Sequence, residues 1–322
     1  MNKILVILGP TSSGKSDIAI KLAKKFNGEI ISADSRQIYR GMDVGTGKTP
    51  GKLIAVRPHS SLAARSVRYK IFISRDISHY MLDIVSPRTE YNVAKFKKQA
   101  EKIIKDILKR GKLPIICGGT GFWISAIVDN VQFPEVKPNW KLRKKLEKYS
   151  TEKLFAMLKK LNPERAETID PKNKVRLIRA IEICKKIKKV PSLKNTRYQI
   201  LNTRYKTLQI GLKLPKEKLH KNIEKRVKIR IKQGMVAEVK KLRKQGLSWK
   251  KIQSFGLAYF WIPLYLQNKI TKQRLVEKII QAEKNYAKRQ MTWFKRDRRI
   301  KWLENYREIE KEINRLLKIQ KD

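Results

Sequence analysis

The chain has 322 residues, more than one compact core usually holds, so we expect a large domain with an insertion, or two domains. Its 77 Lys and Arg against 28 Asp and Glu give a net charge of +49. An excess of this size indicates a polyanionic partner, with nucleic acid the obvious class, although a lysine-biased genome would also produce it.

The first predicted element is a buried strand, Ile4–Leu8, which leads through a glycine-rich turn into a helical pattern. The pattern G-x-x-x-x-G-K-[ST] is matched by Gly9, Pro10, Thr11, Ser12, Ser13, Gly14, Lys15 and Ser16. Backbone N–H groups and the positive end of the helix would converge on an anion here, Lys15 would add a charge, and Ser16 is placed to bind Mg²⁺. The motif predicts a diphosphate or triphosphate site; a chance glycine turn is the alternative.

The second predicted strand is Glu29–Ser32, and Asp34 stands where this strand should end. In an open α/β sheet the carboxyl ends of the strands line the ligand crevice. A carboxylate there can act as a general base or as a magnesium ligand. Alternatively, Asp34 caps a helix that begins at Ser35, since Asp is a favoured N-cap.

Further strand and helix patterns alternate up to about residue 130. Residues 51–74 differ, because Val67–Ile73 alternates like an exposed strand, and we expect a hairpin excursion there. Val93–Arg110 reads as an amphipathic helix, and Leu113–Cys117 as a buried strand whose following glycines would bring the Thr120 hydroxyl to the same crevice. Apolar strands separated by helices predict a parallel sheet covered on both faces.

A basic, helical stretch follows this region. Lys137–Arg197 holds 20 Lys and Arg and 6 Asp and Glu, a surplus of 14. We predict an α/β fold with a P-loop NTPase-like parallel sheet core formed by residues 1–131 and 203–322, and a helical insertion of residues 132–202. After a strand at Thr207–Leu212 the chain should be helical to its end, over Glu217–Gln233, Met235–Gln245, Leu275–Trp293 and Glu304–Ile319. Arg226 falls on the first of these helices, where a solvated face is the default expectation.

Cysteine and histidine usage argues against a metal cluster or a disulfide framework. Cys117 and Cys184 are far apart, and His59, His79 and His220 are scattered. No apolar stretch approaches 18 residues, and the N-terminal apolar run leads into the glycine-rich turn. We therefore expect no membrane association and a cytoplasmic location.

Taken together, seven segments resemble one family, the tRNA dimethylallyltransferases, which prenylate adenosine 37 beside the anticodon. The segments occur in the family's order and run nearly from end to end. They are GPTSSGKS (9–16), ISADSRQIYRGMDVGTGK (31–48), HYMLDIVSP (79–87), GGTGFW (118–123), NKVRLIRAIEI (173–183), GMVAEV (234–239) and YAKRQMTWF (286–294).

The resemblance implies a role for each matching residue. The phosphate loop would hold the diphosphate of dimethylallyl diphosphate, with Ser16 helping to hold Mg²⁺. Asp34 would be the general base, Thr120 would contact the target nucleotide, and Arg226, with Lys15, would neutralise the leaving diphosphate. The positions expected to contact the anticodon stem-loop of tRNA are Asp34, Ser35, Arg36, Gln37, Thr120, Arg143, Val175, Arg176, Leu177, Ile178 and Arg179. We expect a monomer.

The chain departs from the family pattern at several places. Asn222 stands where an arginine is usual, Phe255–Ala258 replaces an I-G-Y-K/R type of segment, and Asn285 stands where Gln is usual. Residues 51–74 are longer than the family's short connection. The alternatives are an adenylate isopentenyltransferase or a P-loop nucleotide kinase acting on a free nucleotide, and, in another class, a non-catalytic RNA-binding P-loop protein.

Overall fold

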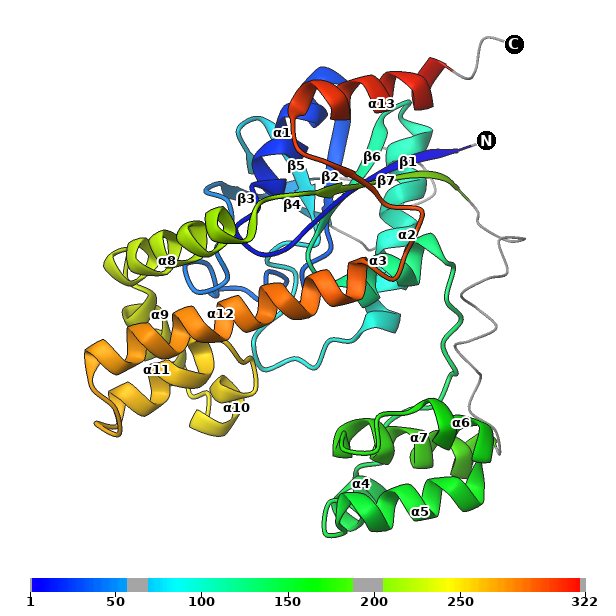
Figure 1. Cartoon of the computed structure of the whole chain (residues 1–322), viewed down its shortest axis with the longest axis vertical. Coiled ribbons are helices and arrows are strands. Elements are labelled where there is room, and N and C mark those ends of the chain that lie inside the picture. The colour runs from blue at the N-terminus through cyan, green and yellow to red at the C-terminus, as the bar shows by residue number, and fades with distance from the viewer. Residues whose placement is uncertain (1, 57–68, 188–204, 319–322) are drawn as a thin grey trace. The chain divides into compact units, whose positions relative to one another are not determined.

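The computed structural model describes residues 2–56, 69–187 and 205–318. It divides the chain into two compact units, Met1–Val128 with Arg204–Asp322, and Asp129–Thr203. We call the first the core unit and the second the insertion (Figure 1). Residues 67–68 of the expected hairpin strand and 188–202 of the expected insertion lie outside the described residues.

An eight-stranded sheet in the order β3-β4-β5-β2-β6-β1-β7-β8 forms the centre of the core unit. From β5 to β8 all neighbouring strands are parallel, whereas β3 and β4 are added antiparallel at one edge. The predicted parallel α/β sheet is therefore confirmed. The strands are β1 (Lys3–Leu8), β2 (Gly28–Ser32), β3 (Lys52–Val56), β4 (Tyr69–Ser74), β5 (Ile77–Tyr80), β6 (Leu113–Gly118), β7 (Lys206–Leu212) and β8 (Lys301–Leu303).

Helices cover both faces of this sheet, and the side chains of β1 alternate between them (Figure 1). Ile4, Val6 and Leu8 pack in one cluster with residues of α2 (Val93–Lys109) and α3 (Gly121–Val128). Leu5 and Ile7 pack in a second cluster with residues of α1 (Lys15–Lys25) and α13 (Tyr306–Lys318). A period of two along a fully buried strand produces these two cores.

The C-terminal part of the core unit is mostly helical. Its helices are α8 (Lys216–Lys232), α9 (Met235–Lys244), α10 (Trp249–Gln253), α11 (Ala258–Leu266) and α12 (Lys272–Phe294). The prediction of helices to the chain end is wrong at β8, which pairs in parallel with β7 between α12 and α13. Three residues are too few to show a period of two, and β8 forms because β7 offers an unpaired edge.

The expected hairpin excursion is present in its described part. Strands β3 and β4 pair antiparallel, with Lys52 opposite Ile73 and Ile54 opposite Ile71. The hairpin joins the parallel sheet through β5, which pairs antiparallel with β4 and parallel with β2. Strand β5 has only four residues and was not predicted.

The described part of the insertion contains helices and no strand. These are α4 (Trp140–Leu146), α5 (Thr151–Leu161), α6 (Pro163–Thr168) and α7 (Lys174–Ile187). The side chains of Asn139, Ser150 and Asn162 each accept a hydrogen bond from the first helical turn, as N-caps do. The insertion has its own hydrophobic core, which includes Leu154, Leu158 and Ile181.

Candidate active site

A cavity of ≈ 650 Å³ lies in the core unit where β1, β2 and β6 end. The turns after these three strands line it, together with side chains of α8 and α12. This is the edge at which a parallel sheet binds its ligands. The cavity brings together five residues predicted as catalytic from the sequence, namely Lys15, Ser16, Asp34, Arg226 and, through contacts described below, Thr120.

The phosphate loop has the backbone of an anion site. Gly14 adopts φ +83°, in the region that favours glycine, and α1 begins directly after it. The hydroxyls of Ser12 and Ser13 are buried and have no hydrogen-bond partner among the described residues. A buried hydroxyl without a partner is costly, and an oxyanion in the loop would satisfy both. The loop therefore fits a diphosphate.

Two cations face this loop without a carboxylate partner among the described residues. Lys15 Nζ donates to Pro10 O at 3.0 Å. Burial lowers the pKa of Lys15, and the nearby charge of Arg226 lowers it further, whereas Cys117 and Asp34 partly oppose this shift. Burial likewise lowers the pKa of Arg226. Its guanidinium donates to Thr11 Oγ1 at 3.3 Å and to Gly47 O at 3.1 Å. The solvated face expected for Arg226 is therefore wrong: it points into the site.

Asp34 holds the turn that follows β2. Its Oδ1 accepts hydrogen bonds from the backbone N–H of Arg36 at 2.8 Å and of Gln37 at 3.3 Å. Residues 35–38 form a turn and not a helix, so Asp34 caps this turn, and the alternative in which Asp34 caps a helix is wrong. The side chain is half-buried in the cavity wall. Capping one turn and accepting a substrate proton are compatible, because a carboxylate has two oxygens.

Thr120 connects the turn after β6 to the turn after β2. Its Oγ1 accepts from the backbone N–H of Ser35 at 3.1 Å, and its side chain also forms a hydrogen bond with Tyr286 of α12. The two turns approach closely at Gly118, where a Cβ would lie 2.3 Å from Ala33 O. Only glycine fits there, and this explains one of the glycines before Thr120.

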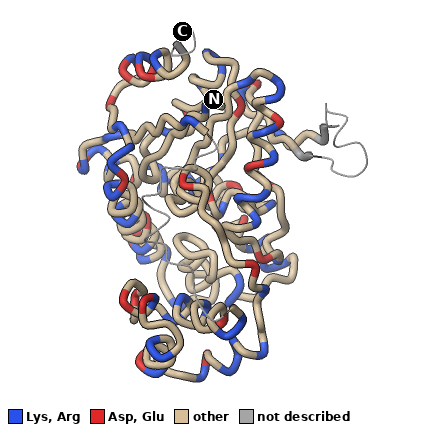
Figure 2. The backbone as a smooth tube through the Cα atoms, turned by 90° about the vertical axis from the view of Figure 1, so that its right-hand side faces the viewer, with Lys and Arg blue, Asp and Glu red and all other residues tan. Residues whose placement is uncertain are grey.

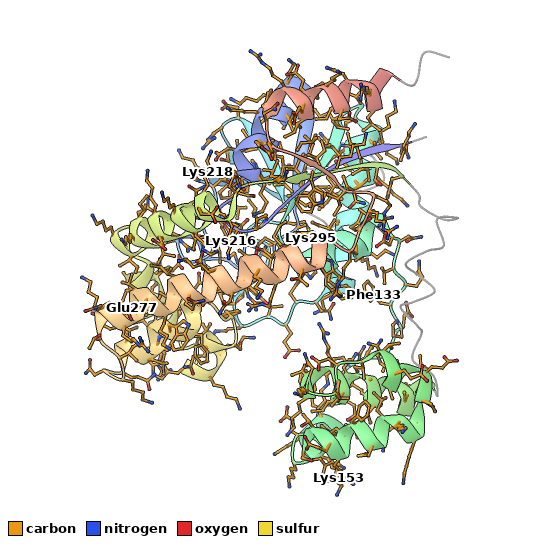
Figure 3. The ribbon with its side chains drawn as sticks, in the orientation of Figure 1. Phe133, Lys153, Lys216, Lys218, Glu277 and Lys295 are labelled. Carbon is orange, nitrogen blue, oxygen red and sulfur yellow. The ribbon has the colours of Figure 1, made fainter. Side chains whose placement is uncertain are left out.

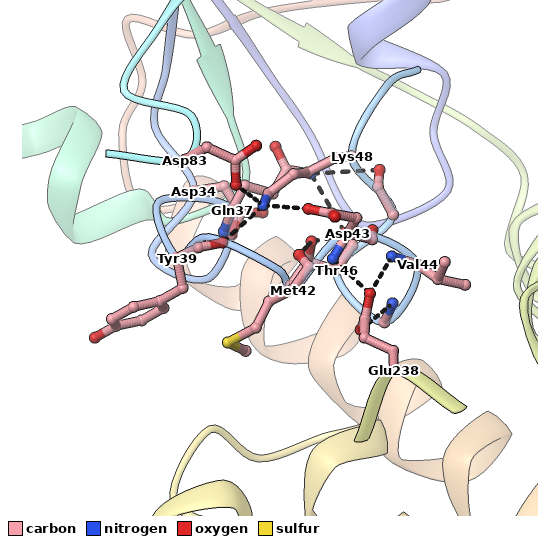
Figure 4. Close-up of polar contacts among 12 residues, drawn as sticks. Asp34, Gln37, Tyr39, Met42, Asp43, Val44, Thr46, Lys48, Asp83 and Glu238 are labelled. Atoms are coloured by element: carbon pink, nitrogen blue, oxygen red, sulfur yellow. Dashed lines mark hydrogen bonds and ion pairs between the residues drawn. The ribbon is translucent and has the colours of Figure 1, made fainter. Parts of the chain in front are cut away.

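The segment Asp43–Lys48 is anchored by side chains from distant parts of the sequence (Figure 4). Glu238 of α9 accepts from three successive backbone N–H groups, at 2.6, 2.7 and 3.0 Å, those of Asp43, Val44 and Gly45. Lys48 forms ion pairs with Asp43 and Asp83. Gln37 donates to Thr46 O at 3.3 Å. The segment thus forms a fixed wall beside Arg226.

Four side chains of α12 that were not predicted also line the cavity: Glu283, Tyr286, Arg289 and Gln290. Glu283 forms a buried ion pair with Arg230, which donates to Gly45 O at 2.9 Å. Burial raises the pKa of Tyr286. Glu283, Tyr286 and Gln290 are three and four positions apart, so they lie on one face of the helix. A row of polar residues on a helix face that should otherwise pack into the core is the sequence signal that could have identified them.

Two of the departures from the family pattern, Asn222 and the segment Phe255–Ala258, lie at the cavity. Asn222 donates from Nδ2 to Ser12 O at 3.4 Å, so the substituted position still contacts the phosphate loop. Leu257 lines the cavity with φ +49°, which is strained for a branched residue, and Phe255 lies beneath the guanidinium of Arg36 at 5.9 Å. Asn285 is exposed and accepts from Gln281.

Of the residues of α7 predicted to contact tRNA, some are exposed and others are buried in the core of the insertion. Val175 is 78% exposed and Arg176 is also exposed. Leu177 is fully buried and Ile178 is 6% exposed, and both belong to the core of the insertion. The expectation that these two side chains contact tRNA is therefore corrected: helical periodicity turns them inward, and they pack the unit.

Arg143 and Arg179 bind a carboxylate inside the insertion. Glu182, whose side chain is 1% exposed, accepts from Arg143 Nε at 2.9 Å, from Arg143 Nη2 at 2.7 Å, from Arg179 and from the backbone N–H of Asn139 at 2.6 Å. Burial alone would raise the pKa of Glu182, but these hydrogen bonds lower it to about 2. We call these three side chains the Glu182 clamp.

No group of three or more His, Cys, Asp or Glu that could hold a metal ion occurs within residues 2–56, 69–187 and 205–318. No helix in the described part of the chain is long and apolar enough to span a membrane. The Cys117 thiol donates to Lys15 O at 3.7 Å, and burial raises the pKa of this thiol to about 11, so it stays protonated at neutral pH.

The P-loop class of α/β proteins is defined by a strand, a glycine-rich turn and a helix, with the turn at the carboxyl ends of the strands of a parallel sheet. A model of the IPP transferase family matches residues 72–297, and a model of the isopentenyl transferase family matches residues 2–92. The first match covers more than half of the chain.

Individual proteins agree with the family models. A tRNA dimethylallyltransferase of Acetivibrio thermocellus is 39% identical over 307 residues, covering 94% of this chain and 92% of the relative. The crystal structure of tRNA delta(2)-isopentenylpyrophosphate transferase from Staphylococcus epidermidis is 36% identical, with a TM-score of 0.67, covering 99% of this chain and 100% of that chain. A eukaryotic dimethylallyltransferase solved acting on tRNA is 26% identical, with a TM-score of 0.72, over 91% of this chain and 70% of that chain. The chain belongs to the tRNA dimethylallyltransferase family.

Proposed function

We propose that this protein transfers a dimethylallyl group from dimethylallyl diphosphate to N6 of adenosine 37 in the anticodon loop of tRNA and releases diphosphate. The observation that carries the proposal is the gathering of a phosphate loop, a carboxylate and two half-buried cations that have no carboxylate partner among the described residues around one cavity. This set matches what the reaction needs at its donor and acceptor ends.

The donor end needs a strongly activated leaving group. The exocyclic amine of adenine is a weak nucleophile because its lone pair is delocalised into the ring, so the bond from C1 to the diphosphate must break easily. Lys15 and Arg226, which both line the cavity, would stabilise the negative charge that develops on the departing oxygen. The orphan hydroxyls of Ser12 and Ser13 would donate to the same diphosphate.

A magnesium ion would assist at this end. Ser16 offers a hard oxygen ligand beside the loop, and no protein cluster of three acidic or histidine ligands competes for the metal among the described residues. Mg²⁺ commonly binds through one or two protein oxygens and the phosphates of its substrate, so the residues present fit it. When bound, it would supply charge neutralisation to the diphosphate.

The acceptor end needs a base and an adenine freed from its stack. As C1 bonds to N6, positive charge develops on N6 and a proton must leave. Asp34 would accept it, since the other two carboxylates that line the cavity, Asp17 and Glu283, are in ion pairs with Arg75 and Arg230. Thr120, held between Ser35 and Tyr286, would contact the target nucleotide. Unstacking a loop adenine costs a few kcal/mol, less than opening a paired one.

The insertion would bind the anticodon stem-loop through exposed cations, of which Arg176 and Lys141 are examples. Lys and Arg also occur along the whole backbone, so their number alone does not mark a surface (Figure 2). Side chains in both units project from the ribbon, as Lys153 does on α5 and Lys218 does on α8 (Figure 3).

A monomeric state and a cytoplasmic location stay predictions.

The competing function is prenylation or phosphorylation of a free nucleotide. The relatives and solved structures named above favour the tRNA substrate over this alternative. Incubation with radiolabelled dimethylallyl diphosphate and either unmodified tRNA or AMP separates the two, with mass spectrometry locating the added group. Label on adenosine 37 of tRNA is expected; label on AMP, or no transfer to either acceptor, would overturn the proposal.

A further inference from the structure

Helix α12 contacts three segments of the cavity through side chains on one of its faces. Glu283 pairs with Arg230 beside the Asp43–Lys48 segment, Tyr286 bonds to Thr120, and Gln290 lies one turn further along. Each side chain therefore touches a different part of the wall. Of the three, Gln290 joins the two segments whose separation matters most for group transfer.

Gln290 uses both ends of its amide in opposite directions. Its Oε1 accepts from the backbone N–H of Thr11 at 2.8 Å, and its Nε2 donates to Gly119 O at 2.8 Å. The residue is 6% exposed, and the close approach leaves no space for a side chain at Gly119, where a Cβ would lie 2.1 Å from Nε2. Because the amide oxygen accepts one of these bonds and the amide nitrogen donates the other, the two bonds fix the orientation of the amide.

The two bonded segments are the donor and acceptor sides of the site. Thr11 belongs to the phosphate loop, and Gly119 precedes Thr120, which in turn binds the turn after Asp34. Transfer requires the reacting atoms to approach to about 3–3.5 Å with the correct alignment, and a displacement of about 1 Å can cost 10²-fold in rate. A rigid link between the two sides would preserve this approach.

We propose that Gln290 is a positioning residue for prenyl transfer: it sets the spacing between the phosphate loop and the Gly119–Thr120 turn, and so between C1 of the donor and N6 of the acceptor. This inference rests on the proposed function. Gln290 itself bonds to backbone groups of both segments, so it acts through them and not on the reacting atoms.

Two substitutions of Gln290 test this role. Gln290→Met keeps the length and volume of the side chain and removes both hydrogen bonds, whereas Gln290→Glu in its ionised form keeps the acceptor for Thr11 N–H and loses the donor to Gly119 O. The matched control is Gln281→Met on the exposed face of the same helix. Equilibrium binding of dimethylallyl diphosphate, single-turnover rates with both substrates saturating, and thermal unfolding are measured for each.

We expect Gln290→Met to lower the single-turnover rate by about 10- to 100-fold while the Kd for the donor changes less than threefold. Gln290→Glu should also be slow, and Gln281→Met should match the wild type. A merely structural residue would lower the unfolding temperature and leave the rate of the folded protein unchanged, and that result, or a wild-type rate for Gln290→Met, would overturn the proposal. Absence of transfer by the wild-type protein would instead contradict the proposed function.

Discussion

In the core unit, Lys15 and Arg226 are half-buried and have no carboxylate partner among the described residues, whereas in the insertion Arg143 and Arg179 are bound to Glu182. Lys15 was predicted from the phosphate-loop pattern, and Arg226, Arg143 and Arg179 from their match to the family. An unpaired buried cation is costly unless a ligand anion completes it. A cation paired to a buried carboxylate is already satisfied, so its first role is to hold the unit together. All four cations are half-buried, so the presence or absence of a carboxylate partner, more than burial or charge, distinguishes the two pairs.

The largest effect is expected at Asp34. Asp34→Asn should slow prenyl transfer by roughly 10²–10⁴, the usual value of a positioned general base. Asparagine can still accept the hydrogen bonds from Arg36 and Gln37 N–H, so the turn and the affinities for both substrates should be kept. Single-turnover kinetics measure the rate. A near wild-type rate would leave Asp34 with only its turn-capping role.

Arg226→Met tests the unpaired cation of the core unit. Removing a donor to the developing charge should lower the rate by roughly 10²–10³ and weaken donor binding. Stability should stay equal or rise, because the substitution removes a desolvated charge that has no carboxylate partner among the described residues. Calorimetric unfolding measures the stability of the variant, and titration with dimethylallyl diphosphate measures its affinity for the donor. A loss of stability as large as the loss of binding would mean that Arg226 is structural, like the arginines of the Glu182 clamp.

Glu182→Gln should have the opposite profile in the insertion. Leaving Arg143 and Arg179 without their carboxylate should destabilise the insertion by about 3–5 kcal/mol, while single-turnover rates at saturating tRNA stay near wild type. Glu167→Gln on the exposed surface of α6 is the control and should change stability by less than about 0.5 kcal/mol. Chemical denaturation followed by circular dichroism measures the difference.

The pH dependence of the same variant gives a second check. The folded-state pKa of Glu182 is about 2, below its ordinary value of 4.5. A carboxyl with a depressed pKa contributes stability that is fully present above about pH 4.5 and is lost as the pH falls through 2. The stability gap between wild type and Glu182→Gln should therefore shrink from pH 5 to pH 2. A constant gap would show that ionisation of Glu182 contributes nothing.

The smallest effect is expected at a single exposed cation of the insertion. Arg176→Glu should weaken tRNA binding by roughly tenfold and reduce the slope of log K against log salt by about 1. Lys311→Glu on α13 makes the same change in net charge in the core unit and should have much less effect. Filter binding over a range of salt concentrations measures both. Equal losses in the two variants would favour an overall charge effect over a defined surface.

The parts of the site that depend on local sequence could be predicted. The phosphate loop is one contiguous segment, and Asp34 and Thr120 follow buried strands, so the rule for strand ends placed them correctly at one edge of the sheet. Arg226 could be placed only through the resemblance, since its own helix suggested a solvated face.

The parts that depend on distant contacts could not. Gln290 is 279 residues from Thr11 and 171 from Gly119, and Glu238 bonds to residues more than 190 positions away. The spacing of apolar and polar residues within one helix or strand carries no information about partners so distant in the sequence. The error at Leu177 and Ile178 was different, because the alternation of exposed and buried positions along α7 was present in the sequence and a helical wheel would have turned both inward.

The central claim is that the core unit performs the chemistry and the exposed cations of the insertion supply RNA affinity. Single-turnover prenylation of tRNA, measured for wild type, Asp34→Asn and Arg176→Glu as the tRNA concentration is raised to saturation with donor in excess, tests it most directly. We expect Arg176→Glu to reach the wild-type rate at saturating tRNA and Asp34→Asn to remain slower by at least about 10². A rate that stays low at saturation for Arg176→Glu, or that recovers for Asp34→Asn, would contradict this division between the two units.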